Sequence, residues 1–167
     1  MIDDDKINIF IMIGSFLLII SIFLPWIKYI DVFSNYSTDL NALNLLTGTF
    51  GIFIPWSNWI DTFGINGYHF PMILPMISGV IGILFGYFRL LQKFEYIQEK
   101  NHHEILYWLC TLSFGTFIYI YITSIVISQY LWGLNVVIYL NGSGILLNLI
   151  GSIIILICGL ILKKQII

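Results

Sequence analysis

The only local cluster of metal-type ligands in this sequence is His102-His103-Glu104. Imidazole and carboxylate groups bind transition metals, and imidazole also titrates near neutral pH. Adjacent side chains on a helix point about 100° apart, so the two histidines cannot grip one ion without a ligand from elsewhere. The cluster also lies in a charged segment between apolar runs, where histidine is ordinary. We therefore expect no metal site.

Asp61 and His69 form a second candidate, because a turn at Asn66-Gly67 would bring a carboxylate and an imidazole together. Such a pair is suited to acid–base chemistry or metal binding. The sequence contains no Ser/His/Asp order, no glycine-rich phosphate loop and no His-Glu-x-x-His motif to support either. We expect a solvated pair, no catalytic residue and no cofactor.

The two cysteines, Cys110 and Cys158, both lie in apolar runs. Because neither lies in a loop, a disulfide framework for the loops is excluded, and without a Cys-x-x-Cys pair no thiol redox relay is expected. Both are typical of small buried hydrophobic residues.

The composition indicates a membrane protein. The 167 residues are 59% hydrophobic and only 10% charged, and the mean hydropathy is +0.93, whereas soluble domains carry about 25% charged residues. A net charge of −2 also argues against nucleic acid as a partner, since binding it requires a basic surface. Lipid is therefore the expected surrounding for one membrane domain over residues 1–167.

Four apolar runs are long enough to cross a bilayer, which takes about 20 residues. They cover residues 7–26, 71–91, 105–127 and 144–162. The acidic start, Asp3-Asp4-Asp5, is unlike a secretory signal, so the first run is expected to be retained. The expected fold class is an all-α transmembrane, multi-pass four-helix bundle.

Positive charges orient this bundle, because cytoplasmic loops are enriched in lysine and arginine. With both termini cytoplasmic, residues 92–104 also lie inside, and residues 27–70 and 128–143 form two outer loops. Only Lys28 then lies outside, and six basic residues lie inside: Lys6, Arg89, Lys93, Lys100, Lys163 and Lys164.

The sequence leaves open whether residues 43–56 are re-entrant or spanning. A rival topology makes them a fifth span, with the N-terminus outside. It also places six basic residues inside, all except Lys6, so the charge rule does not separate the two routes. Length favours four spans, because this segment is well short of about 20 residues and contains Thr47, Gly48, Thr49 and Gly51.

Small residues are expected to pack the helices, because they let backbones approach closely in lipid. Asn148 is expected to hydrogen-bond to a neighbouring helix. A third face is offered by Thr111, Gly115 and Thr123 in residues 105–127. The packing residues predicted for the second and fourth helices are Ser78, Gly82, Gly86, Gly144, Asn148 and Ser152.

The outer loops are expected to form a small cap on the bundle. Thr38-Asp39 would cap a short helix over residues 39–47, and residues 49–54 alternate like a strand. The Asn66-Gly67 turn predicts a hairpin over residues 63–70, and residues 136–140 predict one more strand. Aromatic residues of the cap suit either a protein interface or plain anchoring at the bilayer surface. The candidate outer interaction surface comprises Trp26, Trp56, Trp59 and Tyr68.

The first run ends in Leu24-Pro25-Trp26, and the long loop contains Leu-Asn-Leu-Leu-Thr-Gly at residues 43–48. In this layout the chain resembles small uncharacterised four-helix membrane proteins of prokaryotes over most of its length. The resemblance implies a prokaryotic cell membrane and brings no activity. The outline also resembles claudin-like tetraspans, whose two outer loops form one small sheet. Their paired loop cysteines and Gly-Leu-Trp motif are absent here, so this second likeness is one of architecture.

Together these features predict a non-enzymatic interaction, scaffold or accessory subunit that acts through its extracytoplasmic loops. Its partners would be the lipid bilayer and another protein or a second copy of itself. The alternative is a component of a pore, carrier or membrane enzyme that uses the glycine-lined helix faces and Asn148. No Asp, Glu, Lys, Arg or His lies in the middle of a predicted helix, so transport by a single copy is not expected.

Overall fold

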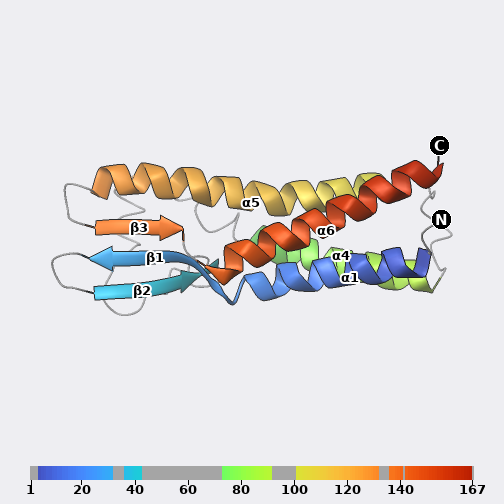
Figure 1. The fold of residues 1–167 in the computed structure, drawn as a ribbon, viewed down its shortest axis with the longest axis horizontal. Coiled ribbons are helices and arrows are strands. Elements are labelled where there is room, and N and C mark those ends of the chain that lie inside the picture. Colours follow the sequence, from blue (N-terminus) through green and yellow to red (C-terminus); the bar gives the residue numbers. More distant parts are fainter. Residues whose placement is uncertain are drawn as a thin grey trace.

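The computed structural model describes residues 4–31, 36–42, 73–91, 101–131, 136–140 and 142–166. In this part of the chain four helices lie alongside one another, and three strands lie beyond one end of the helices (Figure 1). Both chain termini lie at the other end. We call these the strand end and the terminal end of the molecule.

Helix α1 spans Asp4–Ser21, whereas the sequence predicts a helix over residues 7–26. The chain leaves the helix through a tight turn in which the Leu24 backbone N–H donates to the Ser21 carbonyl at 3.3 Å. Pro25 lacks a backbone N–H and disfavours a helical residue before it, so the helix cannot continue to Trp26. At its start, Asp4 and Asp5 interact favourably with the helix dipole.

The strands form one antiparallel sheet in the order β2-β1-β3. Strand β1 spans Pro25–Asp31, β2 spans Tyr36–Asn41, and β3 spans Val136–Leu140. Lys28 of β1 lies opposite Asp39 of β2 on one side and Tyr139 of β3 on the other. The central strand therefore joins two segments that are more than 90 residues apart in sequence.

The strand β3 has the bounds that the sequence predicts. The predicted helix from Asp39 is wrong in its first three residues, because residues 39–41 belong to β2 and pair with β1. Pairing along a central strand satisfies more backbone groups than one isolated helical turn. Of the rest of that helix only Ala42 is described, and it is helical. Residues 43–47, the strand over residues 49–54 and the hairpin over residues 63–70 lie outside the described residues.

Helix α4 spans Leu74–Leu90, α5 spans His102–Leu131, and α6 spans Ser143–Ile166. Pro75 lies in the first turn of α4, where a missing N–H costs nothing. At about 1.5 Å per residue, α5 is about 45 Å long. It extends past the other helices and contacts β3 (Figure 1).

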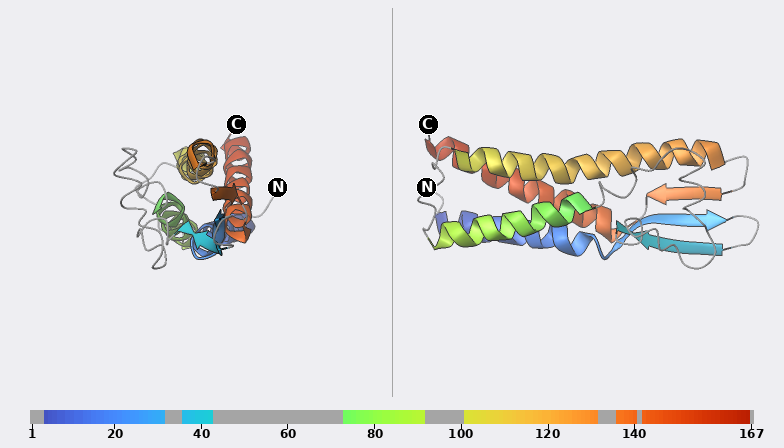
Figure 2. Two further views of the ribbon diagram at one scale, coloured as in Figure 1. Left: turned by 90° about the vertical axis from the view of Figure 1, so that its left-hand side faces the viewer. Right: turned by 180° about the vertical axis from the view of Figure 1, so that it is seen from behind.

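The four helices form a ring in which α1 contacts α4 and α6, and α5 contacts the same two helices (Figure 2). Apolar side chains from all four helices make the core. Two of the helices are long and apolar enough to cross a membrane: α5 over His102–Ile122 and α6 over Ser143–Gln165. Helix α4 is apolar but shorter. The core residues are Ile7, Ile11, Leu18, Phe85, Leu106, Leu109, Cys110, Ile155, Cys158 and Leu162.

Candidate functional site

The sheet is attached to the helices through Trp26, the third residue of Leu24-Pro25-Trp26. Its side chain is 0% exposed, and its Nε1 donates to the Ser21 carbonyl at 2.6 Å. Gly144 lies against this indole so closely that an added Cβ would overlap the ring, and one on Gly142 would overlap the Pro25 backbone. Because glycine alone fits at these two positions, the start of α6 closes over the start of β1.

Residues that lie directly opposite in neighbouring strands share one face of a sheet. Lys28 pairs with Asp39, and Ile30 pairs with Ser37, so these four residues lie on the same face. Ser37 and Asp39 are exposed, and Lys28 and Ile30 are partly exposed. Ile27, which points the other way, is 3% exposed. We call Lys28, Ile30, Ser37 and Asp39 the sheet face.

Trp26 belongs to the interior and not to an outer surface, which corrects the sequence prediction for this residue. An indole at the end of an apolar run resembles an interfacial anchor in sequence, but here the turn at residues 22–24 folds it back onto α1. Trp56, Trp59 and Tyr68 lie outside the described residues. The sheet face was not singled out in the sequence, because residues 27–30 are Ile-Lys-Tyr-Ile and do not alternate between polar and apolar.

The small residues of α4 lie at its interface with α1. Ser78, Gly82 and Gly86 are all buried. An added Cβ on Gly86 would lie 3.0 Å from the Asn8 carbonyl, and one on Gly82 would overlap the Ser15 hydroxyl. Backbone-to-backbone packing of this kind is how membrane helices associate.

Asn148 joins α6 to α5 through two hydrogen bonds. The Ser113 hydroxyl donates to Asn148 Oδ1 at 2.5 Å, and Asn148 Nδ2 donates to the Ser113 carbonyl at 3.2 Å. Asn148 and Ser113 are both 0% exposed. Ser152, one turn further along α6, is also buried, whereas Gly144 packs on Trp26 instead of on another helix.

The third predicted packing face is wrong where it is described. Thr111 and Gly115 are exposed, and an added Cβ on Gly115 would meet no atom within 4 Å. The polar residues that α5 does bury are Ser113 and Thr116. Thr123 has no described side chain. Both faces of α5 carry small polar residues, so sequence spacing alone did not distinguish the inner face.

A polar contact between three helices lies toward the terminal end and was not predicted. Arg89 of α4 donates through Nε to Asn8 Oδ1 of α1 at 2.8 Å, and its Nη1 contacts Nδ1 of His102 in α5. Arginine has only donors, so His102 Nδ1 is the acceptor in this contact. Asn8 and His102 are 3% and 4% exposed. In the sequence, the feature that could have indicated this contact is the single arginine at the end of an apolar run.

The His102-His103-Glu104 cluster is divided between separate surroundings. His102 packs edge-on against Phe85, with ring centroids 5.3 Å apart, and His103 packs against Tyr107 at 5.8 Å. Glu104 is exposed. Among the described residues no three His, Cys, Asp or Glu side chains are grouped to hold a metal ion.

Cys110 and Cys158 are both free and buried. The Cys158 thiol lies 3.9 Å from the Ile7 carbonyl, a weak contact between α6 and α1. Asp61 and His69 lie outside the described residues.

Compared with known proteins, the chain matches no protein-family model, no curated protein and no solved structure.

Proposed function

We propose that this protein is a non-enzymatic, multi-pass membrane protein with four spanning helices, whose sheet face binds a protein partner on the outer side of a cell membrane. The observation that carries the proposal is the pairing of β1 with β3. It unites the segment after α1 and the segment after α5 into one small sheet beyond the helices.

The same pairing supports four spans over five. In the four-span route, residues 25–31 and 136–140 lie on the same side of the membrane. A fifth span at residues 43–56, with the N-terminus outside, would place β1 on the cytoplasmic side and β3 outside. Strands on opposite sides of a bilayer cannot exchange backbone hydrogen bonds. The sheet therefore favours the four-span route.

The distribution of charge supports the orientation. Lys6, Lys163 and Lys164 lie at the terminal end, together with Arg89 in the last turn of α4. Lys28 lies in β1, at the strand end. Because basic residues favour the cytoplasmic side, the terminal end faces the cytoplasm and the sheet faces outward.

The outward faces of the helices support a lipid surrounding. Each of the four helices exposes large apolar side chains, including Phe16 at 56%, Leu84 at 50%, Trp108 at 68% and Ile153 at 50%. In water, an apolar surface spread over four helices would drive association. In a bilayer the same apolar surface contacts lipid chains and needs no protein to cover it.

The interior supports binding at the sheet over a pore or carrier built from the glycine-lined faces and Asn148. The space beside the α4 glycines is occupied by atoms of α1, and the Asn148 side chain is hydrogen-bonded to Ser113. Groups already bonded within the fold are poorly placed to coordinate a moving substrate. On the sheet face, by contrast, Lys28 and Asp39 offer opposite charges beside Ile30.

Purification in mild detergent, followed by identification of the proteins that co-elute, tests the proposal. We expect a partner or a second copy to co-purify with the native chain. Recovery should fall for Lys28→Glu and Asp39→Lys, because like charges would then face the partner. Lys164→Glu, a charge reversal at the opposite end, is the matched control and should leave recovery unchanged.

A monodisperse monomer that mediates measurable flux in liposomes would overturn the proposal in favour of the pore or carrier. Equal recovery from the sheet-face variants and from Lys164→Glu would overturn the assignment of the partner to this face.

A further inference from the structure

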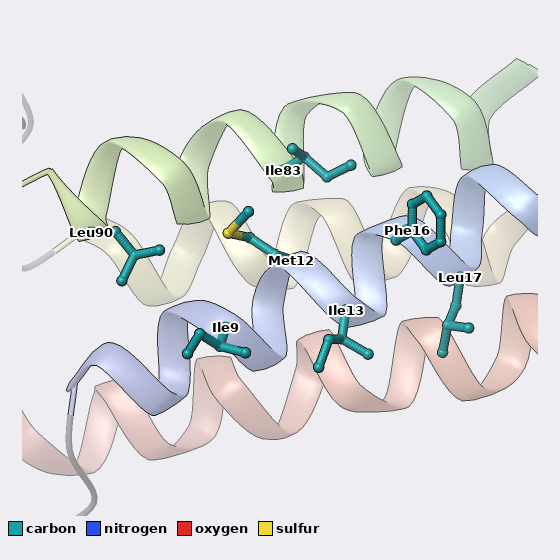
Figure 3. Close-up of a pocket in the computed structure, with 7 residues that line it drawn as sticks. All are labelled: Ile9, Met12, Ile13, Phe16, Leu17, Ile83 and Leu90. Carbon is teal, nitrogen blue, oxygen red and sulfur yellow. The ribbon is translucent and has the colours of Figure 1, made fainter.

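Two surfaces of the described residues are candidates for contact with a neighbouring molecule. One is a groove between α1 and α4 on the outside of the helices, lined by apolar side chains such as Ile13, Phe16 and Ile83 (Figure 3). Lipid chains and apolar helices fit such a groove equally well, so the groove selects no partner. The other surface is the sheet face, which carries two charges that a partner must match.

The sheet face is directed sideways. The strands run along the long axis of the molecule, as the helices do (Figure 1), and the side chains of a strand stand roughly perpendicular to the sheet. In the orientation of the proposed function, the long axis of the molecule is the membrane normal. A protein that stands beside this one in the same membrane therefore meets the sheet face directly.

The two charges of the sheet face lie next to each other. Lys28 of β1 and Asp39 of β2 are directly opposite in the sheet, and Ile30 and Ser37 form another such pair. Asp39 is exposed and Lys28 is partly exposed. In the described part of the chain these two side chains form no ion pair with each other. The face therefore presents a cation and an anion at the same height along the strands.

A surface of this kind is complementary to itself. A twofold axis that runs between β1 and β2, parallel to the strands, exchanges the positions of the two strands. It places Lys28 of one copy over Asp39 of the other, and Ile30 of one copy over Ser37 of the other. The four charges then alternate in sign, so each carboxylate lies between two ammonium groups. Contacts in which both copies use the same patch are the commonest in soluble homo-oligomers.

The membrane restricts the symmetry of such a pair. Two copies that cross one membrane in the same orientation can be related only by a twofold axis along the membrane normal. The axis that matches the charges has this direction, because the strands run along the long axis of the molecule. The charge pattern and the membrane therefore require the same axis, which favours a second copy over an unrelated partner.

We infer that the sheet face binds the sheet face of a second copy of this chain, in a twofold pair in which Lys28 of each copy contacts Asp39 of the other. The inference rests on the proposed function, which places the helices in the membrane and a protein partner at the sheet face. It adds the identity of that partner and the geometry of the contact.

Co-expression of two differently tagged copies, followed by purification through one tag in mild detergent, tests the inference. We expect native copies to recover each other. Lys28→Glu paired with itself, and Asp39→Lys paired with itself, should each lower this recovery about tenfold, because like charges then meet at both contacts. Lys28→Glu paired with Asp39→Lys should restore it, because opposite charges then meet again. Lys164→Glu, a charge reversal at the terminal end, is the matched control and should pair with itself as the native chain does.

The double variant Lys28→Glu/Asp39→Lys decides the matter if a single reversal fails to fold, because it keeps both charges and only exchanges their positions. It should pair with itself but not with a native copy. Equal recovery in all of these pairings would overturn the inference, as would a mixed pair that recovers no better than the single reversals.

The same purification separates the inference from the proposed function. A different protein that co-elutes with the native chain, in place of the second tagged copy, would overturn the inference and leave the proposed function standing. A native chain that recovers neither a second copy nor another protein would overturn both.

Discussion

At the scale of single residues, Trp26 has the clearest structural role. It is the point at which the chain changes from helix to strand, and its indole is enclosed by the end of α1 and the start of α6. A fully buried indole contributes a large apolar surface, and its N–H is satisfied by the Ser21 carbonyl. The Trp26 side chain therefore helps to fix the position of the sheet against the helices.

Trp26→Ala should lower the free energy of unfolding by about 3–5 kcal/mol, because it removes a large buried side chain and leaves a cavity. Denaturation in mixed micelles, followed by circular dichroism, measures this change. Trp108→Ala is the matched control, since that indole is 68% exposed, and it should change stability by less than about 0.5 kcal/mol. Equal effects at the two positions would contradict the burial of Trp26.

The Asn148–Ser113 pair makes a second prediction at this scale. A double-mutant cycle of Asn148→Ala and Ser113→Ala should give a coupling free energy of about 0.6–1.7 kcal/mol, the range for hydrogen bonds between membrane helices. Unfolding of the two single variants and the double variant measures it. Strict additivity of the two substitutions would show that the side chains do not interact.

At the scale of elements, the fold is held by close approach at three sites. Glycines of α4 lie on the backbone of α1, Gly151 of α6 lies on Gly14 of α1, and Asn148 joins α6 to α5. Arg89 adds a polar contact from α4 to α1 and α5. Small residues are suited to these interfaces because dispersion contacts between backbones replace the hydrophobic effect in lipid.

Gly79→Ala and Gly115→Ala test this packing with the same chemical change on two helices. An added Cβ on Gly79 would lie 2.7 Å from the Ser15 carbonyl, whereas one on Gly115 would meet no atom within 4 Å. Gly79→Ala should therefore destabilise the fold by about 1–3 kcal/mol. Gly115→Ala should be neutral or stabilise it by up to about 1 kcal/mol. Thermal unfolding in detergent measures both, and the opposite order would contradict the arrangement of α4 against α1.

Arg89→Lys should destabilise the protein by about 1–2 kcal/mol, because lysine keeps the charge but cannot reach Asn8 and His102 together with a planar fork. Chemical denaturation is again the measurement. Lys163→Gln, at an exposed position of α6, serves as the control and should have little effect. Full stability of Arg89→Lys would show that charge alone accounts for this position.

Much of the fold could be predicted from the sequence, because long apolar runs and small-residue spacing are local signals. The four helices and the strand over residues 136–140 follow from such patterns. The pairing of β1 with β3 could not be predicted, since it joins segments more than 90 residues apart and depends on register. The motif Leu24-Pro25-Trp26 correctly indicated that the first helix ends nearby. The burial of Trp26 could not be predicted, because it depends on Gly144, which is distant in sequence.

The candidate site was less predictable than the fold. Exposed aromatic residues were expected to mark the outer surface, yet the described surface there consists of Lys28, Ile30, Ser37 and Asp39, which share a face only once the register is fixed. The contact of Arg89 with Asn8 and His102 likewise requires three helices to meet. No local sequence pattern predicts such contacts.

At the scale of the whole molecule, the two ends differ in chemistry. The terminal end carries most of the described basic residues, and the strand end carries the sheet built from two separate segments of the chain. We interpret this difference as the two sides of a membrane. The account depends on β1 and β3 lying together on the outer side while the C-terminus lies inside.

Labelling of single cysteines by a membrane-impermeant thiol reagent tests this arrangement most directly. The native Cys110 and Cys158 are buried, so the otherwise unchanged chain is a suitable background. Ser37→Cys, on the exposed sheet face, should be labelled in intact cells, and Lys164→Cys should be labelled only after permeabilisation. Labelling of Ser37→Cys only after permeabilisation, together with Lys164→Cys, would contradict the account and support the five-span route.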